Sequence, residues 1–340
     1  MRRLSFAFIA LPAIAFLAGC GGLSAPGSRA PAASSMLPPA ARAAHTRTLP
    51  SQLLFVTQED GTVGIYSLKD PKSGPIAKIT GLEANQDQMT VDASGNLFVV
   101  NNGAYGNYFY VSEFAPPYTG APTILNTYWK GQIFFPVGIT ADAKGTVYVS
   151  SCGTRCYETA AVYVYPAGAT SPTKEITTHG FSNLAGLAGD AKGDLYAVNY
   201  NAETGAADVY EVRAGSSKPK PLHLHALISA GGGNGVALDA NGDLYVGSTG
   251  LGDYISEFRP GARYAFKVID NLPFGATPGM IDVGPDGNLY VPLACEGSGC
   301  APIYGYKPGA RKPFEEFDVT GYAYVQAVTT APNLQLEGNK

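Results

Sequence analysis

An all-β, six-bladed β-propeller is the fold class that this chain of 340 residues predicts. Three observations predict it: a turn sequence that recurs along the chain, four short strands around each turn, and no segment with sustained helical periodicity. The recurring turn is Asp-Ala-X-Gly or a close variant, and its glycines return at intervals of about 45 to 50 residues, a period typical of propellers. They are Gly95, Gly145, Gly193, Gly242 and Gly287.

Each repeat is interpreted as four antiparallel strands. An apolar run such as 235–238 enters the turn. In the turn, Asp can accept hydrogen bonds from the backbone two residues further on, and Gly adopts positive φ without a Cβ clash. Runs such as 244–246 and 255–258 supply the second and third strands, and a turn such as Pro260-Gly261-Ala262 precedes a more polar fourth strand. Four-stranded units repeated around an axis form the propeller arrangement.

The two ends of the repeat region predict how the ring closes. Runs 53–56 and 63–66 resemble the second and third strands of a blade that has no opening turn of its own. Run 325–332 resembles the innermost strand that this blade lacks. We therefore expect the C-terminal strand to join the N-terminal blade, which leaves no long exposed strand edge. Five complete blades and one shared blade give six blades over 51–333, followed by a tail at 334–340.

The N-terminus indicates secretion. Arg2 and Arg3 precede an apolar stretch over 4–18 that is too short for a membrane span and is typical of a signal peptide over 1–19. Leu17-Ala18-Gly19-Cys20 resembles a bacterial lipobox, which implies cleavage before Cys20 and lipidation of its thiol. An ordinary signal peptide that happens to contain a cysteine is the alternative.

The segment that follows the lipobox predicts the location of the protein. Residues 20–50 are rich in Ala, Pro and Ser, so they form a lipidated Cys20 and a flexible tether. Gly21 after the cysteine favours the outer membrane if the bacterium has two membranes. We expect an extracytoplasmic protein of the cell envelope whose lipid anchor is its only contact with the membrane.

The charge distribution excludes one class of partner. The chain has 23 basic and 27 acidic side chains, a formal net charge of -4, and no basic cluster. Nucleic-acid binding is therefore excluded as the expected function. We expect a monomer that binds a protein, a glycan or a small molecule.

Four cysteines beyond Cys20 form two close pairs: Cys152, Cys156, Cys295 and Cys300. In an oxidising compartment this pattern indicates disulfides, and a shared zinc site is the alternative. The pairs follow the second strands of the third and sixth blades, which lie opposite each other in a six-fold ring. We therefore predict that neighbours in sequence pair, Cys152 with Cys156 and Cys295 with Cys300. Each disulfide closes a short loop and contributes about 2 kcal/mol.

One blade-joining segment, 126–135, contains the only tryptophan of the chain and three more aromatic residues. Tyr128, Trp129, Phe134 and Phe135 can form a stacking surface for a sugar, a peptide or a partner protein. Packing between blades is the alternative, since aromatic side chains fill cores more often than they bind.

Polar side chains after the second strands are the other candidate site. Their oxygens can converge on a hard cation such as Ca²⁺ near the channel mouth, and turn-forming asparagines are the alternative. The residues are Asn101, Asn102, Tyr105, Asn107, Asn199, Tyr200 and Asn201. His179 is the histidine best placed for acid–base chemistry. His223 and His225 offer a weak metal edge site without a third ligand. We predict no cofactor, and no catalytic constellation stands out.

The phrase 135–145, Phe-Pro-Val-Gly-Ile-Thr-Ala-Asp-Ala-Lys-Gly, resembles the repeats of NHL-type propellers. It is also similar to gluconolactonase/regucalcin-like and streptogramin-lyase-like propellers, and the resemblance spans about 52–332. It implies the fold but not an activity, because propellers host unrelated functions. Lactonase-like members place a metal-binding Glu before a Gly/Ala-Pro step in the first blade, and Glu59-Asp60-Gly61 lacks that step. Lyase-like members have a His where this chain has Val137.

The sequence therefore predicts a non-catalytic, lipid-anchored propeller that binds a ligand or a protein at its loop-rich face. A metal-dependent hydrolase or lactonase of the gluconolactonase-like type is the first alternative. A structural envelope protein is the second.

Overall fold

The computed structural model describes residues 52–58, 60–82, 86–102, 109–152, 160–201, 206–225, 233–248, 253–272, 276–295, 302–318, 325 and 327–331. All of them belong to one compact unit, Thr48–Lys340. The signal peptide, Cys20, the tether and the C-terminal tail lie outside the described residues. Within the described ranges no helix is both long and apolar enough to cross a membrane.

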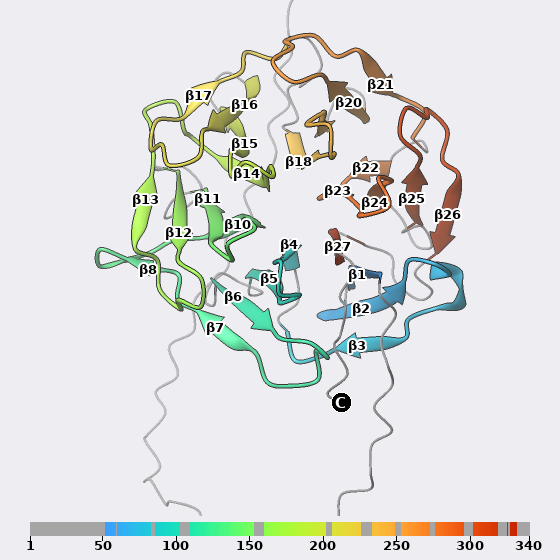
Figure 1. Cartoon of the computed structure of the whole chain (residues 1–340), viewed down its shortest axis with the longest axis horizontal. Coiled ribbons are helices and arrows are strands. Elements are labelled where there is room, and N and C mark those ends of the chain that lie inside the picture. The colour runs from blue at the N-terminus through green and yellow to red at the C-terminus, as the bar shows by residue number, and fades with distance from the viewer. Residues whose placement is uncertain are drawn as a thin grey trace, which may run out of the picture. The chain divides into compact units, whose positions relative to one another are not determined.

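Six sheets stand around a common central axis, and each sheet is one blade (Figure 1). Each blade is given from its innermost to its outermost strand. Blade 1 is β27 (Val328–Ala331), β1 (Leu53–Gln58), β2 (Thr62–Ser67) and β3 (Ala77–Ile79); blade 2 is β4 (Gln86–Val91), β5 (Leu97–Asn102), β6 (Phe109–Phe114) and β7 (Thr123–Leu125); blade 3 is β10 (Pro136–Ala141), β11 (Val147–Ser151), β12 (Ala161–Tyr165) and β13 (Lys174–Ile176).

The other three blades repeat this order. Blade 4 is β14 (Leu184–Gly189), β15 (Leu195–Asn201), β16 (Ala206–Val212) and β17 (Lys220–Pro221); blade 5 is β18 (Gly233–Leu238), β19 (Leu244–Ser248), β20 (Tyr254–Phe258) and β21 (Lys267–Ile269); blade 6 is β22 (Ala276–Pro278) with β23 (Asp282–Val283), then β24 (Leu289–Cys295), β25 (Pro302–Tyr306) and β26 (Glu315–Asp318). A 3-10 turn, η1 (Pro71–Ser73), lies between β2 and β3. The predicted fold class is confirmed, except that the inner strand of blade 6 is broken into two pieces.

The ring is closed by the C-terminal strand, as the sequence predicts. β27 pairs antiparallel with β1, with Val56 opposite Val328 and Leu53 opposite Ala331. Just beyond this ladder, the Thr57 N–H donates to the Ala327 carbonyl oxygen at 3.1 Å, and the Ala327 N–H donates to Thr57 Oγ1 at 3.0 Å. The first blade is therefore assembled from both ends of the repeat region.

The repeated turns reverse the chain between the first and second strands. In blade 2, Asp92 Oδ1 accepts hydrogen bonds from the backbone N–H groups of Ser94 and Asn96, at 2.9 and 2.8 Å. Gly95 has φ 85°, which only a residue without Cβ adopts freely. Asp142, Asp190 and Asp239 make the same contacts in their own blades. The aspartates of the repeat are turn-forming residues.

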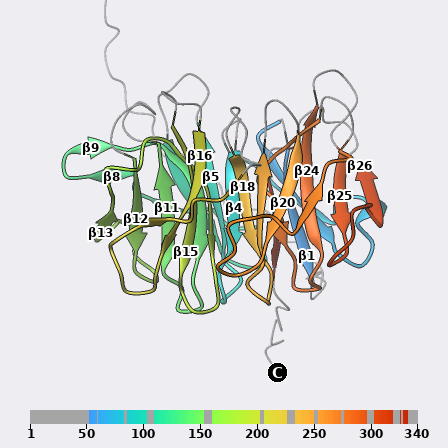
Figure 2. The ribbon, with the colours of Figure 1, turned by 90° about the horizontal axis from the view of Figure 1, so that it is seen from above.

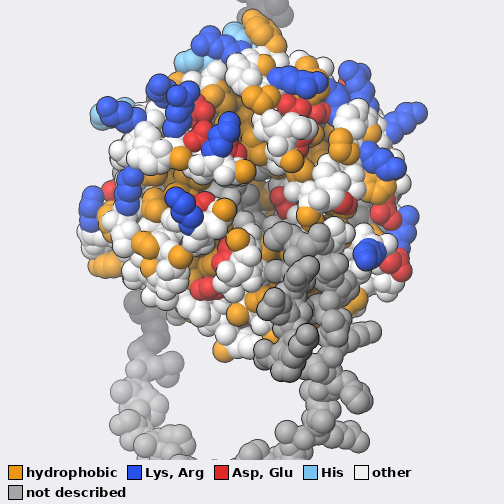
Figure 3. Space-filling view, in the orientation of Figure 1, with side chains coloured by type: hydrophobic (Ala, Val, Ile, Leu, Met, Phe, Trp, Pro, Cys, Tyr) orange, Lys and Arg blue, Asp and Glu red, His pale blue; other side chains and the backbone are white. Residues whose placement is uncertain are grey.

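The core lies between neighbouring blades. In β5, Leu97 and Val99 pack into a cluster with blade 1, while Phe98 and Val100 pack into a cluster with blade 3. Both faces of the strand are buried because the blades stack face to face around the axis. In the face shown in Figure 3, lysine and arginine side chains are spread around the rim and not gathered in one patch.

Candidate functional site

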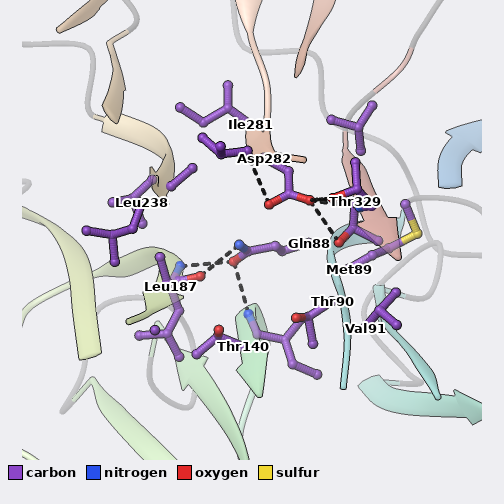
Figure 4. A pocket seen from close by; sticks show the side chains of 18 of the residues that line it. Gln88, Met89, Thr90, Val91, Thr140, Leu187, Leu238, Ile281, Asp282 and Thr329 are labelled. Atoms are coloured by element: carbon purple, nitrogen blue, oxygen red, sulfur yellow. Dashed lines mark hydrogen bonds between the residues drawn. The ribbon is translucent and has the colours of Figure 1, made fainter. Parts of the chain in front are cut away.

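The inner strands of all six blades wall a cavity of about 310 Å³ in the central channel (Figure 4). Its lining includes the ends of these strands next to the repeated turns, such as Val91, Ala141 and Gly189. Most of the lining residues are aliphatic, but the surface that they expose to the cavity is mainly polar, and the polar side chains are Gln88, Asp282 and several threonines. The sequence predictions did not include this cavity.

Gln88 ties three inner strands together. Its Oε1 accepts hydrogen bonds from the N–H groups of Ile139 in blade 3 and Leu187 in blade 4, at 3.0 and 2.9 Å. Its Nε2 donates to the Leu187 carbonyl oxygen at 2.8 Å. One buried amide therefore satisfies three backbone groups of two other blades.

Gln88 stands at a position where other blades have glycine. The inner strands of blades 2 to 5 each have an irregular register at this point. Gly138 and Gly235 occupy it in blades 3 and 5, where a Cβ would collide with the backbone of the next inner strand. A glutamine in the glycine position of the repeat is the sequence signal that could have identified the contact.

Asp282 connects blade 6 to the closing strand. Its Oδ2 accepts hydrogen bonds from the Thr330 N–H at 2.7 Å, Thr330 Oγ1 at 2.9 Å and Thr329 Oγ1 at 3.3 Å. Its Oδ1 accepts one from the Val283 N–H at 2.9 Å. Burial raises the pKa of Asp282 to about 6, although hydrogen bonds from Thr330, Val283 and Thr329 oppose the rise.

The aromatic segment forms an additional hairpin, β8 (Tyr128–Trp129) and β9 (Gln132–Ile133), which projects from the side of the ring (Figure 2). Half of it packs inward. The Phe134 ring is buried and stacks on Tyr163 with centroids 3.7 Å apart. Trp129 meets the same ring edge-on, and its Nε1 donates to Glu175 Oε2 at 3.1 Å. Trp129 and Phe134 therefore make the packing contacts that the sequence left as the alternative.

The other half of the hairpin faces outward. Tyr128 is 49% exposed and Ile133 is 56% exposed, beside Ile124 of the outer strand β7, which is 48% exposed. Together with Phe109, Tyr110, Leu125, Asn126 and Thr127 they line a pocket of about 560 Å³, which we call the rim groove. The described residues that line it include no charged side chain. The Phe135 ring packs on Phe109, with centroids 4.0 Å apart.

The predicted asparagines are engaged within their own blades. Asn101 Nδ2 donates to the Val99 carbonyl oxygen and to Ser112 Oγ, and Asn102 Nδ2 donates to the Asp87 carboxylate. Asn199 Oδ1 accepts from the Ser182 N–H at 2.9 Å, and its Nδ2 donates to the Gly180 carbonyl oxygen at 3.0 Å, which holds the loop before β14. A shared role in cation binding for these residues and Asn201 stays a prediction.

Several predicted site residues cannot be compared with the structure. Tyr105, Asn107, Cys156 and Cys300, and the side chain of Cys295, lie outside the described part. Cys152 is buried at the end of β11, and both disulfides stay predictions. His179 is exposed in the loop before β14. No group of three or more His, Cys, Asp or Glu side chains among the described residues could hold a metal ion.

Comparison with known proteins identifies the architecture. No family model and no curated protein matches the chain. Solved structures do match, among them the nidogen propeller of the nidogen/laminin complex, with a TM-score of 0.67 and 14% identity, over 82% of this chain and 98% of that one. A protein of unknown function from Bacteroides caccae matches with a TM-score of 0.59 and 12% identity, over 82% and 98% of the two chains.

A gluconolactonase-like protein matches with a TM-score of 0.55 and 15% identity, over 76% of this chain and 87% of that one. The resemblance to NHL-type and gluconolactonase-like propellers is confirmed at the level of the fold.

The contacts of Gln88 predict a large effect on stability. Gln88→Ala should lower the free energy of unfolding by about 2–4 kcal/mol, because the buried N–H groups of Ile139 and Leu187 lose their acceptor. Urea denaturation measures the change. Gln132→Ala is the matched control, since Gln132 is exposed on the hairpin, and it should change stability by less than about 0.5 kcal/mol. Equal effects of the two substitutions would contradict the bridging role.

Asp282 predicts an unusual dependence of stability on pH. Its folded pKa of about 6 lies above the unfolded value of about 3.9, so the folded state binds the proton more tightly. The resulting stabilisation is complete below pH 4 and disappears as the pH rises through 6. Asp282 should therefore make the protein more stable at pH 5 than at pH 7.5 by about 1–2 kcal/mol. Urea denaturation of wild type and Asp282→Asn at pH 5 and at pH 7.5 isolates the contribution of Asp282. If the two proteins differ in free energy of unfolding by the same amount at both pH values, the prediction is refuted.

Proposed function

We propose that the chain is a non-catalytic, lipid-anchored, extracytoplasmic binding module, and that its rim groove takes an apolar, extended segment of a partner protein. The observation that carries the proposal is the outward half of the β8–β9 hairpin, where Tyr128 and Ile133 extend an exposed apolar surface onto β7. Apolar pockets of several hundred Å³ are the usual form of a ligand site.

The chemistry of the groove favours an uncharged partner segment. A charged side chain would lose hydration there, and the described lining residues offer it no opposite charge. β7 is the outermost strand of its blade and pairs only with β6 among the described strands. An extended peptide can therefore add to its free edge through main-chain hydrogen bonds while its alternate side chains enter the groove.

The comparisons and the N-terminus support the same role. The nidogen propeller is found in a complex with laminin, so a ring of this fold can serve as a protein-binding module. The expected lipid anchor at Cys20 and the tether over 20–50 would present the ring away from the membrane surface. No resident cofactor is part of this proposal, and the module acts as a monomer.

Peptide selection tests the groove. Decapeptides selected from a displayed random library on the wild-type chain should carry uncharged apolar residues at alternate positions. The double variant Ile124→Lys/Ile133→Lys should bind these peptides at least about tenfold more weakly, since a desolvated ammonium in the groove costs about 1.4 kcal/mol or more. Phe314→Lys is the matched control, because Phe314 is 42% exposed outside the rim groove. The proposal would be refuted if the selected peptides were rich in charged residues. It would also be refuted if they bound the double variant and the control with equal affinity.

A metal-dependent hydrolase is the second candidate, and one observation favours it. Among the described residues, the buried Oδ1 atoms of Asn101 and Asn102 have no hydrogen-bond partner, and the Asp87 carboxylate lies beside Asn102. Oxygen atoms of this kind can serve as ligands for a hard cation.

Calorimetric titration with Ca²⁺, Mg²⁺, Mn²⁺ and Zn²⁺ separates the two candidates. The binding-module proposal expects no stoichiometric binding at millimolar metal and an unchanged melting temperature. Stoichiometric binding that raises the melting temperature, and that Asn102→Ala abolishes, would establish the metal site and justify a screen of lactones and esters.

A further inference from the structure

The channel cavity contains a partly exposed carboxylate, Asp282, that no cation of the described residues pairs with. Asp282 is the only ionisable side chain among the described residues that line the cavity, although all six inner strands contribute to it. None of the ion pairs among the described residues includes Asp282. Buried charges in proteins are normally paired, because their desolvation is otherwise uncompensated.

The hydrogen bonds of Asp282 orient the carboxylate but do not neutralise it. All its donors are neutral backbone N–H or hydroxyl groups. Three of the four bonds fall on Oδ2, on the side of β27, and Oδ1 accepts only the Val283 N–H among the described groups. A carboxylate oxygen can accept two hydrogen bonds, so Oδ1 can accept one more donor from the channel.

The rest of the wall specifies what kind of cation fits. The hydroxyls of Thr329 and Thr330 donate to the carboxylate, Gln88 and Thr140 also line the cavity, and most of the surface exposed to the cavity is polar (Figure 4). A divalent metal ion would find only one carboxylate there, because no group of three or more His, Cys, Asp or Glu side chains lies together among the described residues. A primary ammonium group, with one positive charge and three N–H donors, matches one carboxylate that has further polar surface around it.

We propose that the central channel cavity is a binding site for a small primary ammonium compound, whose charged nitrogen donates to Asp282 Oδ1 and pairs with this carboxylate. A volume of about 310 Å³ limits the ligand to the size of a short alkylamine or a single-ring arylalkylamine. The site is separate from the rim groove and does not depend on the function proposed for it.

Titration of the carboxylate makes the affinity depend on pH. Burial raises the pKa of Asp282 to about 6, while an alkylammonium remains protonated well above neutral pH. No other ionisable group on the cavity-lining parts of β4, β10, β14, β18, β23 or β27 titrates against the ligand. Affinity should therefore fall about tenfold between pH 7.5 and pH 5, as the carboxylate takes up its proton.

Calorimetry on the full chain with n-butylamine and benzylamine as probes tests the site, and 1-butanol and benzyl alcohol are their neutral counterparts. We expect the amines to bind one per chain at pH 7.5 and the alcohols to bind at least about tenfold more weakly. Equal binding of amine and alcohol, no amine binding at millimolar concentration, or displacement of the amine by stoichiometric Ca²⁺ would overturn the proposal.

Three variants locate the site. Asp282→Asn retains an oxygen acceptor for Thr330 and removes the charge, so it should abolish amine binding. Thr90→Leu leaves the carboxylate unchanged and places a larger side chain in the cavity, so it should weaken amine binding. It tests the site even if Asp282→Asn impairs folding. Asp286→Asn is the matched control, because it removes an equal charge from the exposed turn after β23, outside the cavity, and should bind as wild type does. Full binding by Asp282→Asn or by Thr90→Leu would also overturn the proposal.

Discussion

Closure of the ring by the last strand is the contact on which the rest of the structure depends. β27 supplies the inner strand that blade 1 lacks, and it is fixed on both sides. On one side it pairs with β1. On the other, the Val328 N–H donates to the Met280 carbonyl oxygen at 3.2 Å, and Thr330 donates to Asp282. Without this strand β1 would present an unpaired edge, and one wall of the channel cavity would be missing.

Crowding at the channel axis explains why so few side chains reach it. Six inner strands converge there, and at Gly138 and Gly235 the next strand lies so close that a Cβ does not fit. Blade 2 departs from this pattern, because Gln88 reaches across to the backbone of blades 3 and 4. The channel is therefore bridged by one amide and leaves a small cavity whose exposed surface is mainly polar.

The fold could be predicted from the repeat because each repeated turn is specified by residues that are close together in the sequence. Asp and Gly within one turn specify the hairpin, and the turn recurs in each blade. The contacts of Gln88 and Asp282 are not local, since Gln88 meets Leu187 99 residues away and Asp282 meets Thr330 48 residues away. Amino-acid composition also could not predict which residues of the aromatic segment 126–135 are buried and which are exposed. Its division into a buried Phe134 and an exposed Ile133 depends on the hairpin register that places Ile133 opposite Tyr128.

The negative charge of Asp282 is not explained by ring closure alone. The donors on Thr330 and Thr329 are neutral, so the carbonyl oxygen of an asparagine could accept the same hydrogen bonds without burying a charge. The carboxylate instead lowers stability at neutral pH, because its folded pKa lies above its unfolded value. Residues that reduce stability without improving packing are concentrated at functional sites. A cation held in the channel would offset that loss by pairing with the charge, and the closing strand would then also form one side of a ligand site.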